Sequence, residues 1–200
     1  MSLFLAVSLQ IHGQEQLNMH RKTGPSDAKI FKQRLDHFAF GPNALKTFDQ
    51  RYFENDQYVS DPSTIGAALI EIGGEGTIKS APGNDDFFGQ IAQKYNAPIF
   101  QLEHRFYGES QPFVDDEKPL SAEHLTYLSS RHAIADLVNF IYQKDAELCQ
   151  QIGETQIPGK TCVPWMIAGG SYAGAVTAWI TQQHPHLFAA SISSSGVVNA

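Results

Sequence analysis

The stretch Trp165-Met166-Ile167-Ala168-Gly169-Gly170-Ser171-Tyr172-Ala173-Gly174 decides the fold of this chain. An apolar segment leads into two glycines and a serine, and the small residues that follow can begin a helix. This order is typical of a nucleophile elbow, in which a serine stands on a strained turn between a strand and a helix. The strict pattern G-x-S-x-G fails at one position, where Ala173 replaces the second glycine. Alanine is small enough to keep the helix close to the strand, so the stretch still predicts an elbow.

A flexible Gly-Gly-Ser turn is the alternative, and the flanking segments argue against it. Residues 163–168 form a short apolar run suited to a buried parallel strand. Residues 172–183 contain no proline, are rich in alanine and stop at His184-Pro185, as a helix would. The N-terminus of that helix would favour negative charge developing in front of the serine hydroxyl. Ser171 is therefore the candidate nucleophile.

The rest of the chain alternates strand-like and helix-like segments. Apart from the elbow, helices are expected at 87–95 and at 130–148, where Ile134, Leu137, Val138 and Ile141 follow the spacing of one helical face. Strands are expected at 29–38, 47–53, 67–72, 97–102 and 189–198, with a turn at Gly41-Pro42-Asn43 between the first two. This alternation predicts an α/β fold with a mostly parallel sheet.

Composition limits the functional classes. A chain of 200 residues with 42% hydrophobic residues can bury one core but not two large domains. The net charge of −7 and the lack of a dense Lys/Arg cluster argue against nucleic-acid binding. No apolar run reaches the ~18–20 residues of a membrane-spanning helix.

Both ends of the chain carry signals about its organisation. Residues 1–13 resemble the apolar part of a signal peptide, although the basic start is missing and a frayed tail or a first strand is the alternative. Residues 14–29 read as a polar lead-in and 30–200 as an incomplete core. The predicted strand at 189–198 would leave an apolar edge uncovered. We therefore expect the chain to be the N-terminal part of a larger protein.

Cys149 and Cys162 are the two cysteines of the chain. In an oxidising compartment a disulfide between them would close the intervening loop, and two reduced thiols are the equal alternative. They lack neighbouring histidine or cysteine partners at metal-site spacing, so no metal site is expected. The chain also has no N-x-[ST] sequon, which weakens the case for secretion.

Six blocks of sequence, taken together and in order, have a recognisable pattern. They are Gln33-Arg34-Leu35-Asp36-His37-Phe38, Gln50-Arg51-Tyr52-Phe53, Gly73-Gly74-Glu75-Gly76, Leu102-Glu103-His104-Arg105-Phe106-Tyr107-Gly108-Glu109-Ser110, Tyr127-Leu128-Ser129-Ser130-Arg131 and Gly170-Ser171-Tyr172-Ala173-Gly174. These blocks resemble the prolyl carboxypeptidase and dipeptidyl peptidase II family of serine peptidases. The similarity runs from about Phe31 to the C-terminus and looks strongest to the thymus-specific serine protease branch.

The resemblance implies an α/β-hydrolase core, interrupted after the elbow by a helical cap domain that this chain lacks. It implies a lysosomal or secreted exopeptidase that needs no cofactor, cleaves peptides next to proline or releases dipeptides, and uses Ser171 as nucleophile. Tyr172 would supply one backbone N–H to the oxyanion hole, and Gly74, in the loop 73–76, would supply the second.

Glu75 has two interpretations. Its carboxylate could hold the terminal amine of a substrate, as an aminopeptidase-like exopeptidase needs. Equally, it could cap the loop or pair with an arginine.

The remaining charged residues of the blocks are interpreted as structural. The Glu103-His104-Arg105-Phe106-Tyr107 block precedes the elbow, whereas hydrolase triads run Ser, then Asp/Glu, then His. Arg105 and Glu109 are expected to form buried polar ties. Arg131 and Asp136 are expected to be solvated or paired surface groups.

The triad partners of Ser171 are missing from the sequence. No Asp or Glu follows Ser171, and His184 and His186 lie too close to it along the chain to fold back. Without a base a serine hydroxyl is barely nucleophilic, so the chain alone is expected to be inactive. Three hypotheses follow: a portion of an active serine exopeptidase, a non-catalytic binding or decoy protein, or a lipase- or esterase-like hydrolase.

Overall fold

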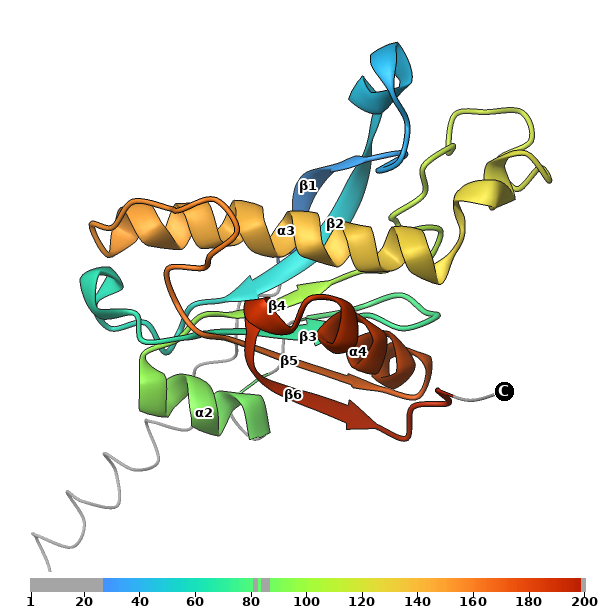
Figure 1. The fold of residues 1–200 in the computed structure, drawn as a ribbon. Coiled ribbons are helices and arrows are strands. Elements are labelled where there is room, and N and C mark those ends of the chain that lie inside the picture. Colours follow the sequence, from blue (N-terminus) through green and yellow to red (C-terminus); the bar gives the residue numbers. More distant parts are fainter. Residues whose placement is uncertain (1–26, 81–82, 84–86, 199–200) are drawn as a thin grey trace, which may run out of the picture.

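The computed structural model describes residues 27–80, 83 and 87–198, which form a six-stranded sheet with helices on both faces (Figure 1). The predictions for residues 1–13 and most of the lead-in 14–29 lie outside the described residues. The strands are β1 Lys29–Arg34, β2 Thr47–Asn55, β3 Ala68–Ile72, β4 Ile99–Leu102, β5 Trp165–Gly170 and β6 Phe188–Ser194. The helices are α2 Phe87–Tyr95, α3 Ser130–Gln151 and α4 Tyr172–Gln183. Short 3₁₀ turns occupy Gly41–Leu45, Pro62–Thr64, His124–Tyr127 and Pro185–Leu187.

The strand order is β1-β2-β4-β3-β5-β6. β1, β2 and β4 pair antiparallel, whereas β4, β3, β5 and β6 are parallel to one another. The predicted α/β fold with a mostly parallel sheet is therefore confirmed. Because the parallel strands share a direction, the loops after β3, β4 and β5 all leave the same edge of the sheet.

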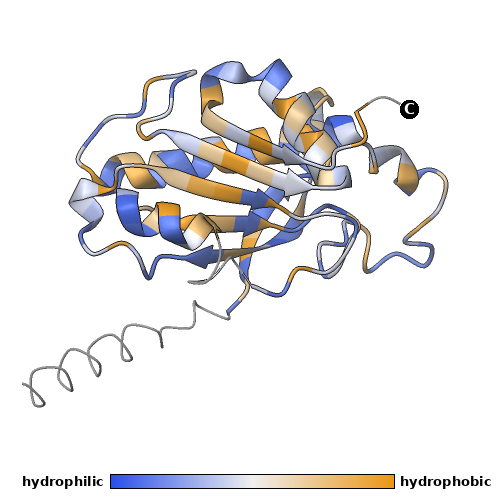
Figure 2. Cartoon of the chain, turned by 90° about the horizontal axis from the view of Figure 1, so that it is seen from below, coloured by the Kyte–Doolittle hydropathy of each residue, from blue (hydrophilic) through white to orange (hydrophobic). Residues whose placement is uncertain are grey.

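The sheet has an apolar core on each face. Helices α3 and α4 cover one face, where Phe140 of α3 and Val176 of α4 are fully buried against Ile70, Phe100 and Trp165 of the strands. Helix α2 lies on the opposite face, shown from below in Figure 2, over a smaller apolar cluster. Neighbouring residues of β3 point to opposite faces, as the two-residue period of a strand requires. Both core faces are therefore supplied by the same apolar strands.

Some element boundaries differ from the prediction. The first strand ends at Arg34 rather than at residue 38. The Leu35 N–H still donates to the Lys46 carbonyl in register with β2, but the chain then turns, and the Phe38 N–H donates to the Asp36 carboxylate at 2.8 Å. The expected turn at Gly41-Pro42-Asn43 lies inside the 3₁₀ turn Gly41–Leu45. Helix α3 begins at Ser130, as predicted, and the Ser129 hydroxyl caps it by accepting a hydrogen bond from the His132 N–H. The helix ends at Gln151, three residues beyond the predicted end at residue 148. None of the described helices combines the length and the apolar character needed to cross a membrane.

A disulfide ties the end of α3 to the start of β5. Cys149 and Cys162 are bonded, with their Cα atoms 5.5 Å apart, which is one of the two alternatives that the sequence left open. Beside them the buried Asp145 carboxylate accepts the Cys162 N–H at 2.8 Å and the Trp165 indole N–H at 3.0 Å. The loop that precedes β5 is thereby fixed by the disulfide and by the buried Asp145 carboxylate.

Candidate active site

Ser171 stands on the turn between β5 and α4. Its φ of 57° and ψ of −126° are unfavourable for a residue with a side chain. The turn is held by the Ser171 N–H, which donates to the Ser194 carbonyl of β6 at 3.0 Å, and by the Ser171 carbonyl, which accepts from Ala175 at 3.0 Å. The residue is exposed, and within the described part of the chain its hydroxyl has no hydrogen-bond partner. The geometry is that of a strained elbow presenting a free hydroxyl.

Two glycines allow the helix to approach the strands. A Cβ on Gly169 would stand 2.4 Å from the Ala173 carbonyl oxygen, and a Cβ on Gly174 would stand 2.5 Å from the Ser194 carbonyl oxygen. Both distances are far below van der Waals contact, so a side chain at either position would push α4 away. Ala173 itself is buried without needing to be glycine. The close approach to β6 is thus made by Gly174, one residue after the position that the strict pattern specifies.

Two backbone N–H groups are unused near Ser171. Tyr172 is the first residue of α4, where a helix leaves its N–H without an intrahelical acceptor. Among the described residues neither the Tyr172 N–H nor the Gly74 N–H makes a hydrogen bond, whereas the Gly73 N–H donates to Leu102. Because β3 and β5 are parallel neighbours, the loop that follows β3 and the elbow that follows β5 leave the same edge of the sheet.

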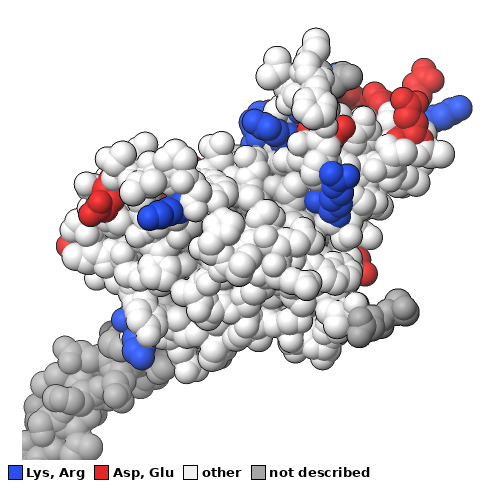
Figure 3. All heavy atoms as spheres, in the orientation of Figure 1, with Lys and Arg blue, Asp and Glu red and all other residues white. Residues whose placement is uncertain are grey.

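A hollow opens beside the elbow at this edge of the sheet. Its volume is about 320 Å³, and its lining comes from the loop after β3, the loop after β4, the start of α3 and one face of α4. The lining residues are Glu75, His104, Tyr107, Leu128, Ser129, Ser130, Tyr172 and Trp179. Few charged side chains lie over α4 and β6 on the face shown in Figure 3. Half of the lining residues carry an aromatic or imidazole ring, and Glu75 supplies the single carboxylate of the lining.

Glu75 is that carboxylate, and it is exposed. The structural alternative for Glu75, a loop cap or an arginine pair, has no counterpart among the hydrogen bonds and ion pairs of the described residues. The side chain of Tyr172 is half-buried near it. Burial, and after it the nearby charges of Glu75 and Tyr107, raise the pKa of Tyr172 to about 12, so the phenol stays protonated.

His104 is buried and hydrogen-bonded to Tyr172. Its Nε2 lies 3.0 Å from the Tyr172 hydroxyl, and its Nδ1 lies 2.7 Å from the Arg105 carbonyl oxygen. Burial lowers the pKa of His104 below its ordinary value, because the charged imidazolium loses more hydration than the neutral ring. The imidazole is therefore neutral near pH 7.

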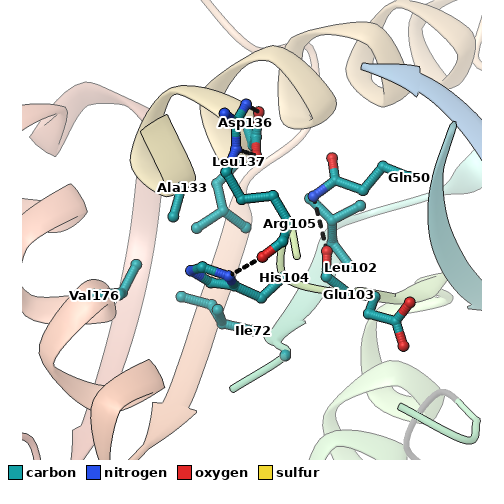
Figure 4. A pocket seen from close by; sticks show the side chains of 11 residues that line it. Gln50, Ile72, Leu102, Glu103, His104, Arg105, Ala133, Asp136, Leu137 and Val176 are labelled. Atoms are coloured by element: carbon teal, nitrogen blue, oxygen red, sulfur yellow. Dashed lines mark hydrogen bonds and ion pairs between the residues drawn. The ribbon is translucent and has the colours of Figure 1, made fainter. Parts of the chain in front are cut away.

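The next residue, Arg105, anchors this loop in the protein interior. Its guanidinium pairs with both carboxylate oxygens of Asp136 at 2.6 Å, and the Asp136 carboxylate also contacts His37 Nε2 at 2.7 Å. Figure 4 shows the Arg105 side chain reaching Asp136 on α3 while the His104 ring lies between Ile72, Ala133 and Val176. The prediction that Asp136 is a surface group is wrong, because Asp136 is only 1% exposed. The Asp136 carboxylate is buried because Arg105, in the loop after β4, pairs with it there.

A second buried pair lies beside the first. The Glu103 carboxylate is fully buried and accepts the Arg51 guanidinium, the Ser110 hydroxyl and backbone N–H groups. Arg105 is a buried tie as predicted. Glu109 is not, since its side chain is 74% exposed although it pairs with Arg51 at 2.9 Å. Arg131 is exposed as predicted and lies over the Phe38 ring.

The described residues provide no base for Ser171. His184 is the C-cap residue of α4, and Nε2 of His186 lies 3.2 Å from the Tyr142 hydroxyl oxygen. A helix of 12 residues is about 18 Å long, so these histidines lie at its far end from the serine. Within 27–80, 83 and 87–198 the one close group of metal-ligand types is Asp145, Cys149 and Cys162, and the disulfide leaves its sulfurs unable to act as thiolate ligands.

Sequence reasoning missed the hollow and the His104–Tyr172 contact. The strand pattern held a usable signal, because His104 lies two residues after the end of β4 and Tyr172 two residues after the end of β5. Both ends lie at the shared carboxyl edge of the parallel part of the sheet, with β3 between them. Trp179 lies seven residues after Tyr172, on the same face of α4.

Known structures share this architecture. The acylaminoacyl peptidase of Pyrococcus horikoshii superposes with a TM-score of 0.55 at 17% sequence identity, covering 91% of this chain and 24% of that one. This likeness confirms the fold, an α/β-hydrolase type.

Sequence relatives identify the family. The human lysosomal Pro-X carboxypeptidase is 36% identical over 168 residues, which cover 84% of this chain and 31% of that protein. The Arabidopsis thaliana relative named "Probable serine protease EDA2" is 37% identical over 170 residues, 85% of this chain and 32% of that protein. The chain thus spans about a third of the length of the curated relatives that it matches. The model of the family described as serine carboxypeptidase S28 matches residues 33–200, and the chain belongs to this family of serine peptidases.

Proposed function

We propose that this chain carries the nucleophile and the oxyanion hole of a serine exopeptidase. The observation that carries the proposal is Ser171, strained on its turn with a free hydroxyl in front of the N-terminus of α4. The Ser171 oxygen attacks the carbonyl carbon of the scissile bond, and its proton passes to a base. The N–H groups of Tyr172 and Gly74 hold the oxyanion, each contributing about 2.7–4 kcal/mol to the transition state. The amine then leaves with a proton, and water hydrolyses the acyl-enzyme.

The base is expected from outside these residues. In hydrolases of this fold the acid and the histidine follow the serine along the chain, and no Asp or Glu follows Ser171 here. A site without its base keeps only the catalysis of the oxyanion hole and of binding, about 10³–10⁴ over water. The 200-residue chain by itself is therefore proposed to be close to inactive.

The substrate is proposed to be a peptide held by one end. Glu75 stands in an aromatic hollow beside the serine, where its carboxylate would bind the protonated amino terminus of a peptide. This favours dipeptidyl or aminopeptidase-like trimming. Family membership supports proline-related specificity as well, and a lysosomal or secreted location agrees with the Cys149–Cys162 disulfide and with a relative named as lysosomal.

A fluorophosphonate probe tests the nucleophile directly. The probe is applied to the 200-residue chain and to any longer product that contains it, each with a Ser171→Ala control. Labelling that disappears with Ser171→Ala supports the proposal, and labelling of the longer form alone places the base outside these residues. Absence of labelling in every form would overturn it and favour a binding or decoy protein, for which the lack of a base near Ser171 is the supporting observation.

A further inference from the structure

We propose that His104 is a positioning residue for the reaction at Ser171 and acts through the hydroxyl of Tyr172. This role rests on the proposed function, because it concerns the residue whose N–H would serve the oxyanion hole. His104 lies before the nucleophile in the chain and so cannot be the histidine of a triad in hydrolase order. Its contacts nevertheless end one residue from the nucleophile.

The direction of the hydrogen bonds follows from chemistry. The Arg105 carbonyl oxygen can only accept, so Nδ1 of His104, 2.7 Å away, must carry the ring proton. In the neutral ring Nε2 is then an acceptor, and the Tyr172 hydroxyl donates to it over 3.0 Å. The hydrogen bond thus has a single direction, from Tyr172 to His104.

The ring of His104 is held more firmly than that of Tyr172. It packs edge-on between Tyr107 and Tyr172, with ring centroids 5.3 Å and 5.4 Å away. On either side of it along the chain, the Glu103 carbonyl accepts from Gln50 and the Arg105 guanidinium is bound to Asp136. Tyr172 is half-buried and follows a strained serine. His104 therefore acts as the fixed partner that restrains Tyr172.

This restraint has two consequences at the site. It limits rotation of the Tyr172 side chain on the first residue of α4, whose N–H the proposed function assigns to the oxyanion hole. It also uses the one donor of the Tyr172 hydroxyl, so that toward the hollow this oxygen can only accept a hydrogen bond. The Tyr172 oxygen and the Glu75 carboxylate are then two acceptors in the lining of the hollow, which suits the N–H groups of a protonated amine.

Burial extends the restraint to mildly acidic conditions. Three groups favour protonation of His104, namely the Arg105 carbonyl that accepts from Nδ1 and the carboxylates of Asp136 and Glu75. The Arg105 guanidinium opposes it, and two phenols pack against the ring. Burial outweighs the carboxylates and lowers the pKa of His104, so the acceptor nitrogen persists below the pH at which an exposed histidine would lose it.

The test compares variants in the form of the protein that the probe labels. His104→Phe removes the acceptor and fills the volume, Tyr172→Phe removes the donor, and His104→Gln offers an acceptor oxygen in place of Nε2. His186→Phe is the matched control, since His186 also contacts a tyrosine hydroxyl through Nε2, at the far end of α4. Loss of a hydrogen bond of ordinary strength predicts a two- to tenfold slower rate at Ser171, about the range of such bonds.

The expected result is that His104→Phe and Tyr172→Phe each lower kcat or the labelling rate, that the double variant is no slower than either, and that His104→Gln recovers part of the loss. His186→Phe should react like the wild type. A folded His104→Phe protein that reacts at the wild-type rate would overturn the proposal. A double variant whose loss of rate equals the product of the two single losses would overturn it as well. Neither result would affect Ser171 as the proposed nucleophile.

A spectroscopic readout separates this role from the proposed function. In the ¹⁵N NMR spectrum, Nε2 of His104 should show a hydrogen-bonded acceptor in the wild type and a free one in Tyr172→Phe. If no form labels at Ser171, the function fails, and the spectrum still decides whether the contact exists. An unchanged Nε2 signal in Tyr172→Phe refutes it.

Discussion

The Ala173 carbonyl oxygen lies 2.4 Å from the point at which a Cβ on Gly169 would stand. The neighbouring Gly170 has open space at the same point, with nothing within 4 Å. A side chain would therefore clash at Gly169 but not at Gly170, although the sequence shows glycine at both positions. The elbow depends on the first of them.

Gly169→Ala is expected to destabilise the protein by about 1–3 kcal/mol, since the added methyl group must displace α4. Gly170→Ala is the matched control and should leave the midpoint of urea unfolding nearly unchanged. Equal midpoints for the two variants would show that the helix does not approach the strand at Gly169.

Asp136→Asn is expected to lower the free energy of unfolding by about 3–5 kcal/mol, because it leaves the buried Arg105 guanidinium without its counter-charge. Lys29→Ala removes a solvent-exposed partner of Glu54 and should cost about 1 kcal/mol or less. The comparison is made by urea denaturation of both variants. A loss for Asp136→Asn no larger than that for Lys29→Ala would place Asp136 at the surface, as the sequence alone suggested.

Replacing both Cys149 and Cys162 by serine should lower the free energy of unfolding by about 3 kcal/mol, the value expected for a loop with a sequence separation of 13. A reducing agent should shift the wild-type unfolding curve by the same amount and leave the double variant unaffected. If reduction does not shift the wild type, the two thiols are not bonded in solution.

The stability of the fold should fall as the pH is lowered from 7.5 to 5. Because the folded-state pKa of His104 is below its ordinary 6.5, the unfolded chain binds the proton first, and the stabilisation present above pH 6.5 is lost as the pH falls through the folded pKa. His132 and His184 shift in the same direction and share the effect. His104→Gln should therefore flatten, without abolishing, the dependence of the unfolding midpoint on pH. An identical pH dependence in this variant would contradict the shift at His104.

In the form of the protein that the fluorophosphonate probe labels, Glu75→Gln should raise KM for peptides with a free amino terminus and leave KM for N-acylated ones unchanged. Only the former place a positive charge beside residue 75. The comparison is made with paired substrates that differ only in that acyl group. A variant that handles both peptides like the wild type would remove Glu75 from substrate binding.

Much of the fold was predictable because it depends on local pattern. Apolar runs, a helical face and small residues around Ser171 specify the strand, the turn and the helix without long-range information. The family followed from ordered blocks of sequence, and one of these blocks contains both Glu103 and Arg105. Their structural role was predictable from their position before the elbow.

Only the tertiary structure decided which polar groups meet. Asp136 looks like a surface residue on a polar helix face, yet the sheet brings Arg105 to it from 31 positions away in the chain. The contact of His104 with Tyr172 likewise spans 68 positions. Local periodicity specifies which face of an element is buried, whereas the register of β3, β4 and β5 determines which loop ends lie side by side. The sequence by itself therefore determined the elbow and its candidate nucleophile, whereas the packing of distant strands built the hollow beside them.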